Sequence, residues 1–136
     1  MLIADESGFP KQGTQSVGVA RQYCGHVGKI ANCQHGVFLA YASDRGRRFV
    51  DWRLYLPAER LDEAHVVEHA RCGVPADLRS QTEPALGLAM VRGVIERGVL
   101  PVRWVLADER SRSRKRRASS GWITTRCGVG GVGTTT

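Results

Sequence analysis

The chain has 136 residues, 42% of them hydrophobic, and a net charge of +7, which is a composition typical of one soluble globular domain. It has no apolar run of about 18 residues, and its start, "MLIADESGFPKQG", lacks the basic and apolar regions of a signal peptide. We therefore exclude a membrane or secreted protein and expect a cytoplasmic one. Cysteines in that compartment are usually free thiols. We therefore interpret the four cysteines as thiols, and consider metal ligands or disulfides only as second choices.

The first half of the chain predicts three strands. Residues 1–7 form a short apolar run that ends in acids, and residues 8–18 read as a loop because glycine, proline and polar residues punctuate them. Residues 32–43 alternate and then become apolar, which predicts a second strand. The turn signal "DRGR" at 44–47 joins it to an antiparallel strand over 48–57.

The second half predicts two helices followed by a strand. The first helix covers residues 58–73, and the second covers residues 82–100 with Thr82 as its N-cap. Residues 102–109, "VRWVLADE", predict a further apolar strand that ends in acids. The order β-β-β-α-α-β indicates an α/β fold with a mixed sheet covered by helices. Weak strand character at 122–125 is followed by low-complexity Gly/Thr sequence.

The excess positive charge lies entirely in the last 27 residues. Residues 1–109 hold 13 Lys/Arg and 13 Asp/Glu, whereas residues 110–136 hold seven Lys/Arg and no acid. Such a run attracts nucleic-acid phosphates through counterion release, without sequence specificity. We therefore predict a folded part, 1–109, and a disordered basic tail, 110–136. The candidate phosphate-binding residues of the tail are Arg114, Lys115, Arg116 and Arg117. The alternative is a solvated arm with no partner.

Two predicted strands of similar character end in a carboxylate, at Asp5 and at Asp108. If these strands lie side by side in one sheet, the two aspartates come close together and can hold Mg²⁺ or Mn²⁺ through oxygen ligands. Two such ions activate a nucleophile and stabilise a leaving phosphate oxygen. The alternative is that both acids merely end their strands.

Two Cys-x-His pairs, Cys24/His26 and Cys33/His35, contain residue types that bind zinc. Their spacing is not a common zinc spacing, and buried cysteines are frequent in protein cores. Zinc therefore stays an alternative to core packing at these positions.

The segment "HVVEH", His65 to His69, matches the pattern of inverted zinc peptidases, since both histidines would share a helix face. No second helix offers an obvious carboxylate ligand. A zinc peptidase is therefore a third reading of the chain, against a solvated helix face.

Four short blocks together point to one family: "GFPKQG", "SVGVARQY", "NCQ" and "RLYLP", followed by "GVP" and "WVLADE". In order and spacing they resemble the DDE transposases of bacterial insertion sequences, over about Leu2 to Glu109. The resemblance implies a ribonuclease-H-like catalytic domain that cuts element ends and joins them to target DNA. It also implies a structural role for residues 18–44, which would connect the first two catalytic strands.

The resemblance implies that three acids hold two Mg²⁺ ions. The first maps onto Asp5 on the first strand, and the second maps onto Asp108 at the end of the fourth strand. The third is a glutamate on a later helix, but no acid follows Glu109 in this sequence. Glu109 itself is a poor substitute, because neighbouring residues of a strand point to opposite faces.

The sequence also departs from the family pattern. Arg60 stands near a position where the family tends to have Trp, and Glu83 where it tends to have Lys. The family's N-terminal region is missing, and after Asp108 the catalytic segment gives way to an acid-free tail that looks like an out-of-frame reading. We therefore expect a fold incomplete at the C-terminus and a truncated transposase that is inactive alone.

DNA is the partner that the resemblance implies, with Lys11 and Arg21 as candidate backbone contacts and a homo-oligomer as the state of the intact relatives. The rival from another class is a non-enzymatic nucleic-acid-binding fragment that acts through its basic tail.

Overall fold

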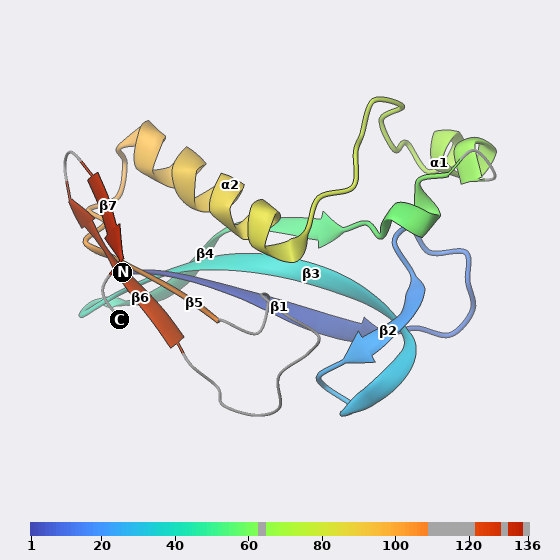
Figure 1. Ribbon diagram of the computed structural model, residues 1–136, viewed down its shortest axis with the longest axis horizontal. Coiled ribbons are helices and arrows are strands. Elements are labelled where there is room, and N and C mark those ends of the chain that lie inside the picture. The colour runs from blue at the N-terminus through green and yellow to red at the C-terminus, as the bar shows by residue number, and fades with distance from the viewer. Residues whose placement is uncertain (63–64, 109–121, 129–130, 135–136) are drawn as a thin grey trace. The chain divides into compact units, whose positions relative to one another are not determined.

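The structure is a computed structural model that describes residues 1–62, 65–108, 122–128 and 131–134. Figure 1 shows its strands and helices with the labels used below. At Asp108 and in residues 122–128 and 131–134 the description is of the backbone alone. Within the described residues no helix is long and apolar enough to span a membrane.

In the residues that the structure describes, seven strands and three helical segments follow one another. The strands are β1 (Leu2–Pro10), β2 (Ala20–Cys24), β3 (Lys29–Ser43), β4 (Gly46–Tyr55), β5 (Trp104–Asp108), β6 (Trp122–Gly128) and β7 (Gly131–Thr134). The helical segments, which lie between β4 and β5, are the 3₁₀ turn η1 (Ala58–Arg60) and the α-helices α1 (Val66–Arg71) and α2 (Glu83–Arg97).

The strands form one mixed sheet in the order β2-β3-β1-β5-β6-β7, with β4 also paired to β3. The pair β1/β5 is parallel, whereas β2/β3, β5/β6 and β6/β7 are antiparallel. This confirms the predicted α/β class with a mixed sheet.

The chain divides into two compact units, and β1, β3 and β4 each contribute to both.

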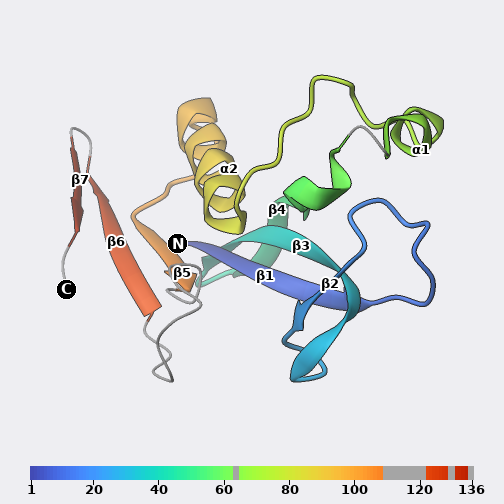
Figure 2. The ribbon, with the colours of Figure 1, turned by 45° about the vertical axis from the view of Figure 1, so that its right-hand side comes forward.

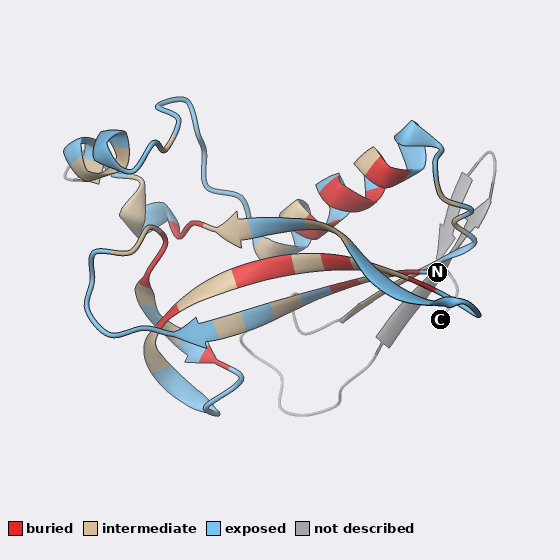
Figure 3. Cartoon of the chain, turned by 180° about the vertical axis from the view of Figure 1, so that it is seen from behind, coloured by how far each residue is buried: buried red, intermediate tan, exposed pale blue. Residues whose placement is uncertain are grey.

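Unit 1 consists of residues 1–5, 38–52 and 83–136. Helix α2 buries Gly87, Met90, Val91 and Val94, a spacing of three and four residues that forms one helix face. Figures 1 and 2 show α2 lying along one face of the strands. The alternate residues Leu2, Ala4 and Leu39 are buried in the same core, and Figure 3 shows the buried stretches of β3 and α2.

Unit 2 consists of residues 6–37 and 53–82. Its buried side chains come from the β2/β3 hairpin, from the loop before it and from the residue that follows β4: Val19, Cys24, Cys33, Val37 and Leu56. The hairpin closes at Gly28, which has a φ of +67° and donates its N–H to the carbonyl of Cys24 (2.9 Å). Glycine suits this position because a side chain is disfavoured in the left-handed region.

The structure corrects three of the predicted elements. Strand β1 does not end at residue 7 but continues to Pro10, and β2 forms inside a segment for which no strand was predicted. The predicted helix over 58–73 is instead a 3₁₀ turn and a helix of six residues. Before α1, His65 Nδ1 donates to the carboxylate of Asp62, and such local side-chain bonds compete with a continuous helix.

The structure describes the backbone of only part of the basic tail, namely residues 122–128 and 131–134. Strand β6 pairs with β5 over Trp104↔Arg126 to Asp108↔Trp122, and β7 pairs with β6. Residues 109–121, which include Arg114, Lys115, Arg116 and Arg117, lie outside the described residues. The predicted disorder and phosphate binding of that stretch therefore stay predictions.

Candidate active site

The two candidate catalytic aspartates occupy neighbouring backbone positions in unit 1. Strands β1 and β5 pair in parallel at Leu2↔Val105, Ile3↔Leu106 and Ala4↔Ala107, so Asp5 and Asp108 each come one residue after the last pair. Adjacent strands lie about 4.8 Å apart. The predicted side-by-side arrangement of the two strands is thus present. Asp5 is exposed and lies inside β1 rather than at its end, whereas Asp108 is the last residue of β5.

The register of β1 against β3 shows what lies on the other side of Asp5. The N-terminal amino group of Met1 donates to Ala42 O (2.9 Å), and the N–H of Ala42 donates to Met1 O (2.8 Å). Four residues further along the antiparallel pair, Asp5 is opposite Phe38. Opposite residues share a face of the sheet, so Phe38 lies beside Asp5 and away from the α2 core.

A second aromatic ring extends this face. The rings of Phe38 and Phe49 are tilted at 57° with their centroids 5.8 Å apart, and the side chain of Phe49 on β4 is 72% exposed. The face therefore carries, from β5 to β4, the position of Asp108, then Asp5, Phe38 and Phe49. Sequence reasoning missed the two aromatic residues. The alternation of Arg47, Phe49 and Asp51 in "RRFVDW" is the signal that could have found them.

The other acid considered for this site, Glu109, lies outside the described residues. Among the residues that the structure describes with their side chains, no three His, Cys, Asp or Glu are grouped closely enough to hold a metal ion. The donor chemistry at Asp5 suits a hard divalent cation, because an exposed carboxylate offers oxygen ligands. The backbone places a second aspartate at the adjacent position.

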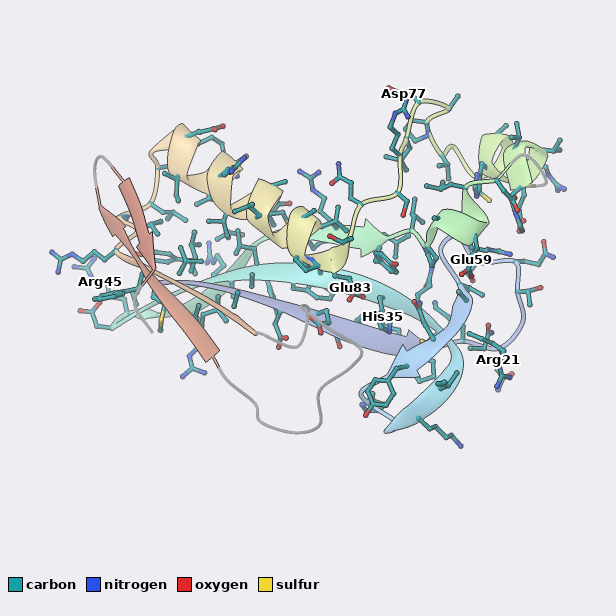
Figure 4. The ribbon with its side chains drawn as sticks, viewed as in Figure 1. Arg21, His35, Arg45, Glu59, Asp77 and Glu83 are labelled. Carbon is teal, nitrogen blue, oxygen red and sulfur yellow. The ribbon has the colours of Figure 1, made fainter. Side chains whose placement is uncertain are left out.

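The two basic candidates of the folded part, Lys11 and Arg21, belong to unit 2. Both are exposed, and Figure 4 labels Arg21 on β2. The main chain of Lys11 is held by Asn32: its N–H donates to Asn32 O (2.9 Å), and its carbonyl accepts from Asn32 Nδ2 (3.0 Å). The "NCQ" block thus fixes the "GFPKQG" loop, while DNA binding by Lys11 and Arg21 stays a prediction.

The two Cys-x-His pairs do not form two equivalent metal sites. Their cysteines pack together in unit 2 instead. Cys24 and Cys33 are fully buried neighbours, and the Cys33 thiol donates to Gln22 O (3.8 Å), whereas His26 is exposed. Burial raises the pKa of Cys33, and the neighbouring Cys24 raises it further. A raised pKa keeps the Cys33 thiol protonated at neutral pH, as expected for a cysteine that packs as a small apolar side chain.

His65 of the "HVVEH" segment has both ring nitrogens engaged. Arg60 Nη1 donates to His65 Nε2 (3.0 Å), and Nδ1 donates to the Asp62 carboxylate. The ring stacks on that of His69 at a centroid distance of 6.1 Å. A zinc ligand needs a free nitrogen lone pair, so this geometry gives the zinc-peptidase interpretation no support.

Comparison with known proteins shows which family the chain belongs to. No curated protein and no solved structure matches the chain. A family model described as "DDE superfamily endonuclease" matches residues 1–111. The chain belongs to this family. The match confirms the resemblance to DDE transposases, and it spans Asp5, Asp108 and the paired strands that carry them.

Membership of the DDE superfamily endonucleases fixes the general activity. The chain carries a transposase-like nuclease domain, and nucleases of this kind act on DNA and depend in general on divalent metal ions.

Proposed function

We propose that this chain is the catalytic part of a DDE transposase of the insertion-sequence type, with Asp5 and Asp108 as two of its catalytic acids. The observation that carries the proposal is the parallel β1/β5 pair, which brings the two aspartates to adjacent backbone positions inside the matched region. The substrate is DNA at the ends of a mobile element. The chemistry is hydrolysis of a phosphodiester followed by strand transfer.

The strand order supports a ribonuclease-H-like arrangement. Leaving aside the short strand β2, the neighbours run β4-β3-β1-β5, with three successive strands next to one another and β5 added in parallel to β1. In open α/β sheets, ligand sites form outside the ends of neighbouring parallel strands. This arrangement is consistent with a site at Asp5 and Asp108.

The proposed residues fit a divalent cation by their chemistry. Asp5 and Asp108 would hold Mg²⁺ or Mn²⁺ through carboxylate oxygens. When bound, such ions activate the attacking oxygen and neutralise charge that develops on the leaving oxygen. The protein's own contribution would be to hold the two aspartates at adjacent backbone positions of the parallel β1/β5 pair.

We infer further that the 136 residues alone do not cut DNA. In-line phosphoryl chemistry with two ions needs enough carboxylate oxygens to fix both ions and the nucleophile, and no acid follows Glu109 in the sequence.

A nicking assay tests the proposal. The chain and its Asp5→Asn variant are incubated with Mn²⁺ or Mg²⁺ and supercoiled plasmid, and metal binding is measured in parallel. We expect metal binding that needs Asp5, without nicking. Nicking that Asp5→Asn abolishes would overturn the inferred inactivity, and metal binding unchanged by Asp5→Asn would overturn the catalytic site. DNA affinity carried wholly by the tail would then favour the non-enzymatic alternative.

A further inference from the structure

An aromatic side chain on β4 is unusually exposed for its size. Phe49 is 72% exposed although its ring rests on the half-buried ring of Phe38. The contact holds the Phe49 ring beside that of Phe38 while most of the residue stays open to solvent. A single exposed apolar residue is ordinary on a protein surface, so whether this ring belongs to a binding site depends on what lies beside it.

The position of this ring relative to the candidate acids follows from the strand register. Asp5 on β1 is opposite Phe38 on β3, and Phe38 contacts Phe49 on β4. With strands about 4.8 Å apart, Phe49 lies two strands, or about 10 Å, from Asp5 on the same face of unit 1. This is on the order of the distance between a phosphate and a base one or two nucleotides away.

Positive charge lies on the turn side of the ring, whereas Asp51, two residues further along the same strand, lies on its other side. Arg47 precedes Phe49 by two residues in the same strand and therefore shares its face, and Arg45 lies in the β3–β4 turn. Both arginines are exposed, and Figure 4 labels Arg45 at the end of the hairpin. Within the described part of the chain, no acid forms an ion pair with either arginine. Their charge is available to an anionic ligand.

We propose that Phe49, supported by Phe38 and with Arg45 and Arg47 on its turn side, is a stacking site for an unpaired base of the DNA strand whose phosphate lies at Asp5. The inference rests on the proposed function and adds to it a single-stranded DNA contact on β4. Phe49 stacks on the base, and the two arginines bind the adjacent phosphates. All of these residues act in positioning the strand rather than in the chemical step.

The charge of the two arginines and the exposure of the Phe49 ring together favour single-stranded DNA as the ligand of this site. A ring face stacks on a base only where that base is unpaired, and stacking between aromatic side chains and bases tolerates any sequence. The arginines supply the phosphate contacts that such sites combine with stacking. A purely apolar protein partner would leave Arg45 and Arg47 without counter-charges.

The experiment uses the full chain and fluorescence anisotropy with a labelled thymidine oligonucleotide of about 12 residues, a length in the range of known single-strand sites. The variants are Phe49→Ala, Phe49→Tyr and Arg47→Ala. Trp52→Ala is the matched control, because Trp52 is 64% exposed on the same strand and an odd number of residues from Phe49, hence on the opposite face. The basic tail is identical in all variants, so its contribution cancels.

We expect Phe49→Ala to weaken single-strand binding about 10-fold, the effect of losing one stacked base, and duplex binding by less than about 2-fold. Phe49→Tyr keeps a stacking ring and retains the affinity, and Trp52→Ala also retains it. Arg47→Ala reduces the slope of log K against log salt by about 0.7, the value for one phosphate contact on a single strand. Urea midpoints equal to wild type show that the variants are folded.

Three outcomes would overturn the stacking site. The first is single-strand affinity of Phe49→Ala equal to wild type, and the second is a loss of the same size in Trp52→Ala. The third is an effect of Phe49→Ala on self-association alone, which would assign the ring to contact with a second copy. Failure of the proposed function looks different: Mn²⁺ binding would then be unaffected by Asp5→Asn while Phe49→Ala still weakens binding of the oligonucleotide.

Discussion

Gly18, in the "SVGVARQY" block, is the glycine whose replacement should cost unit 2 most. It is buried with a φ of +74°, and a β-carbon there would lie 2.9 Å from Leu56 Cδ2 and 2.9 Å from the carbonyl oxygen of Tyr55. The left-handed backbone costs an alanine about 1–2 kcal/mol. Forcing a methyl group against packed atoms, one of them backbone, adds about 1–3 kcal/mol. Gly18→Ala should therefore lose about 2–5 kcal/mol of unfolding free energy.

Gly28 provides the matched control. Its φ is +67°, but no atom lies within 4 Å of its added β-carbon, so Gly28→Ala carries the backbone cost without the clash. We expect it to lose about 1–2 kcal/mol in urea unfolding followed by circular dichroism. Equal losses for the two variants would refute the close approach of Gly18 to the end of β4.

Three further predictions concern the thiol cluster and the tail. Gly8→Ala should lose about 1 kcal/mol in the same urea assay, because its β-carbon would lie 3.0 Å from Cys24 Sγ and 3.1 Å from His35 Nε2; a stabilised variant would contradict this packing. Because the pKa of Cys33 is raised on folding, its contribution to stability is present below the unfolded pKa of about 9 and is lost as pH rises through the folded value. Unfolding free energy should thus fall more steeply above about pH 9 in wild type than in Cys33→Ser, and equal slopes would contradict the raised pKa. Replacing the four basic residues at 114–117 with Gln should make the salt slope for duplex DNA shallower by about 3 to 4 if each contacts one phosphate, and an unchanged slope would place the DNA contacts in the folded part.

The parts of the fold that sequence predicted are those with strong local periodicity. Helix α2 shows its buried face at Gly87, Met90, Val91 and Val94 in the spacing of its apolar residues, and its end is marked by Gly98 with a φ of +63°. The apolar runs of β3, β4 and β5 likewise predicted strands at these positions. The adjacency of β1 and β5 was predicted from two runs of the same character that each reach an aspartate.

The parts that sequence missed depend on contacts between distant residues. Strand β2 forms because it pairs with the start of β3, from Ala20↔Cys33 to Cys24↔Lys29. The sequence "ARQYC" has no alternation of apolar and polar residues that would predict this pairing. The convergence of Cys24 and Cys33 likewise needs the closed hairpin. The Phe38–Phe49 contact requires the register of two strands, which neither residue reveals alone.

The central claim is that Asp5 and Asp108 bind a divalent metal ion together. Mn²⁺ binding followed by electron paramagnetic resonance tests it most directly, with the chain, Asp5→Asn, Asp108→Asn and Asp77→Asn, whose exposed carboxylate belongs to unit 2. We predict that the chain and Asp77→Asn bind Mn²⁺ with equal affinity, and that either of the other two variants weakens binding at least about 10-fold, since removing a ligand removes a main part of the site. Mn²⁺ binding that is unchanged in Asp5→Asn and Asp108→Asn would contradict the account.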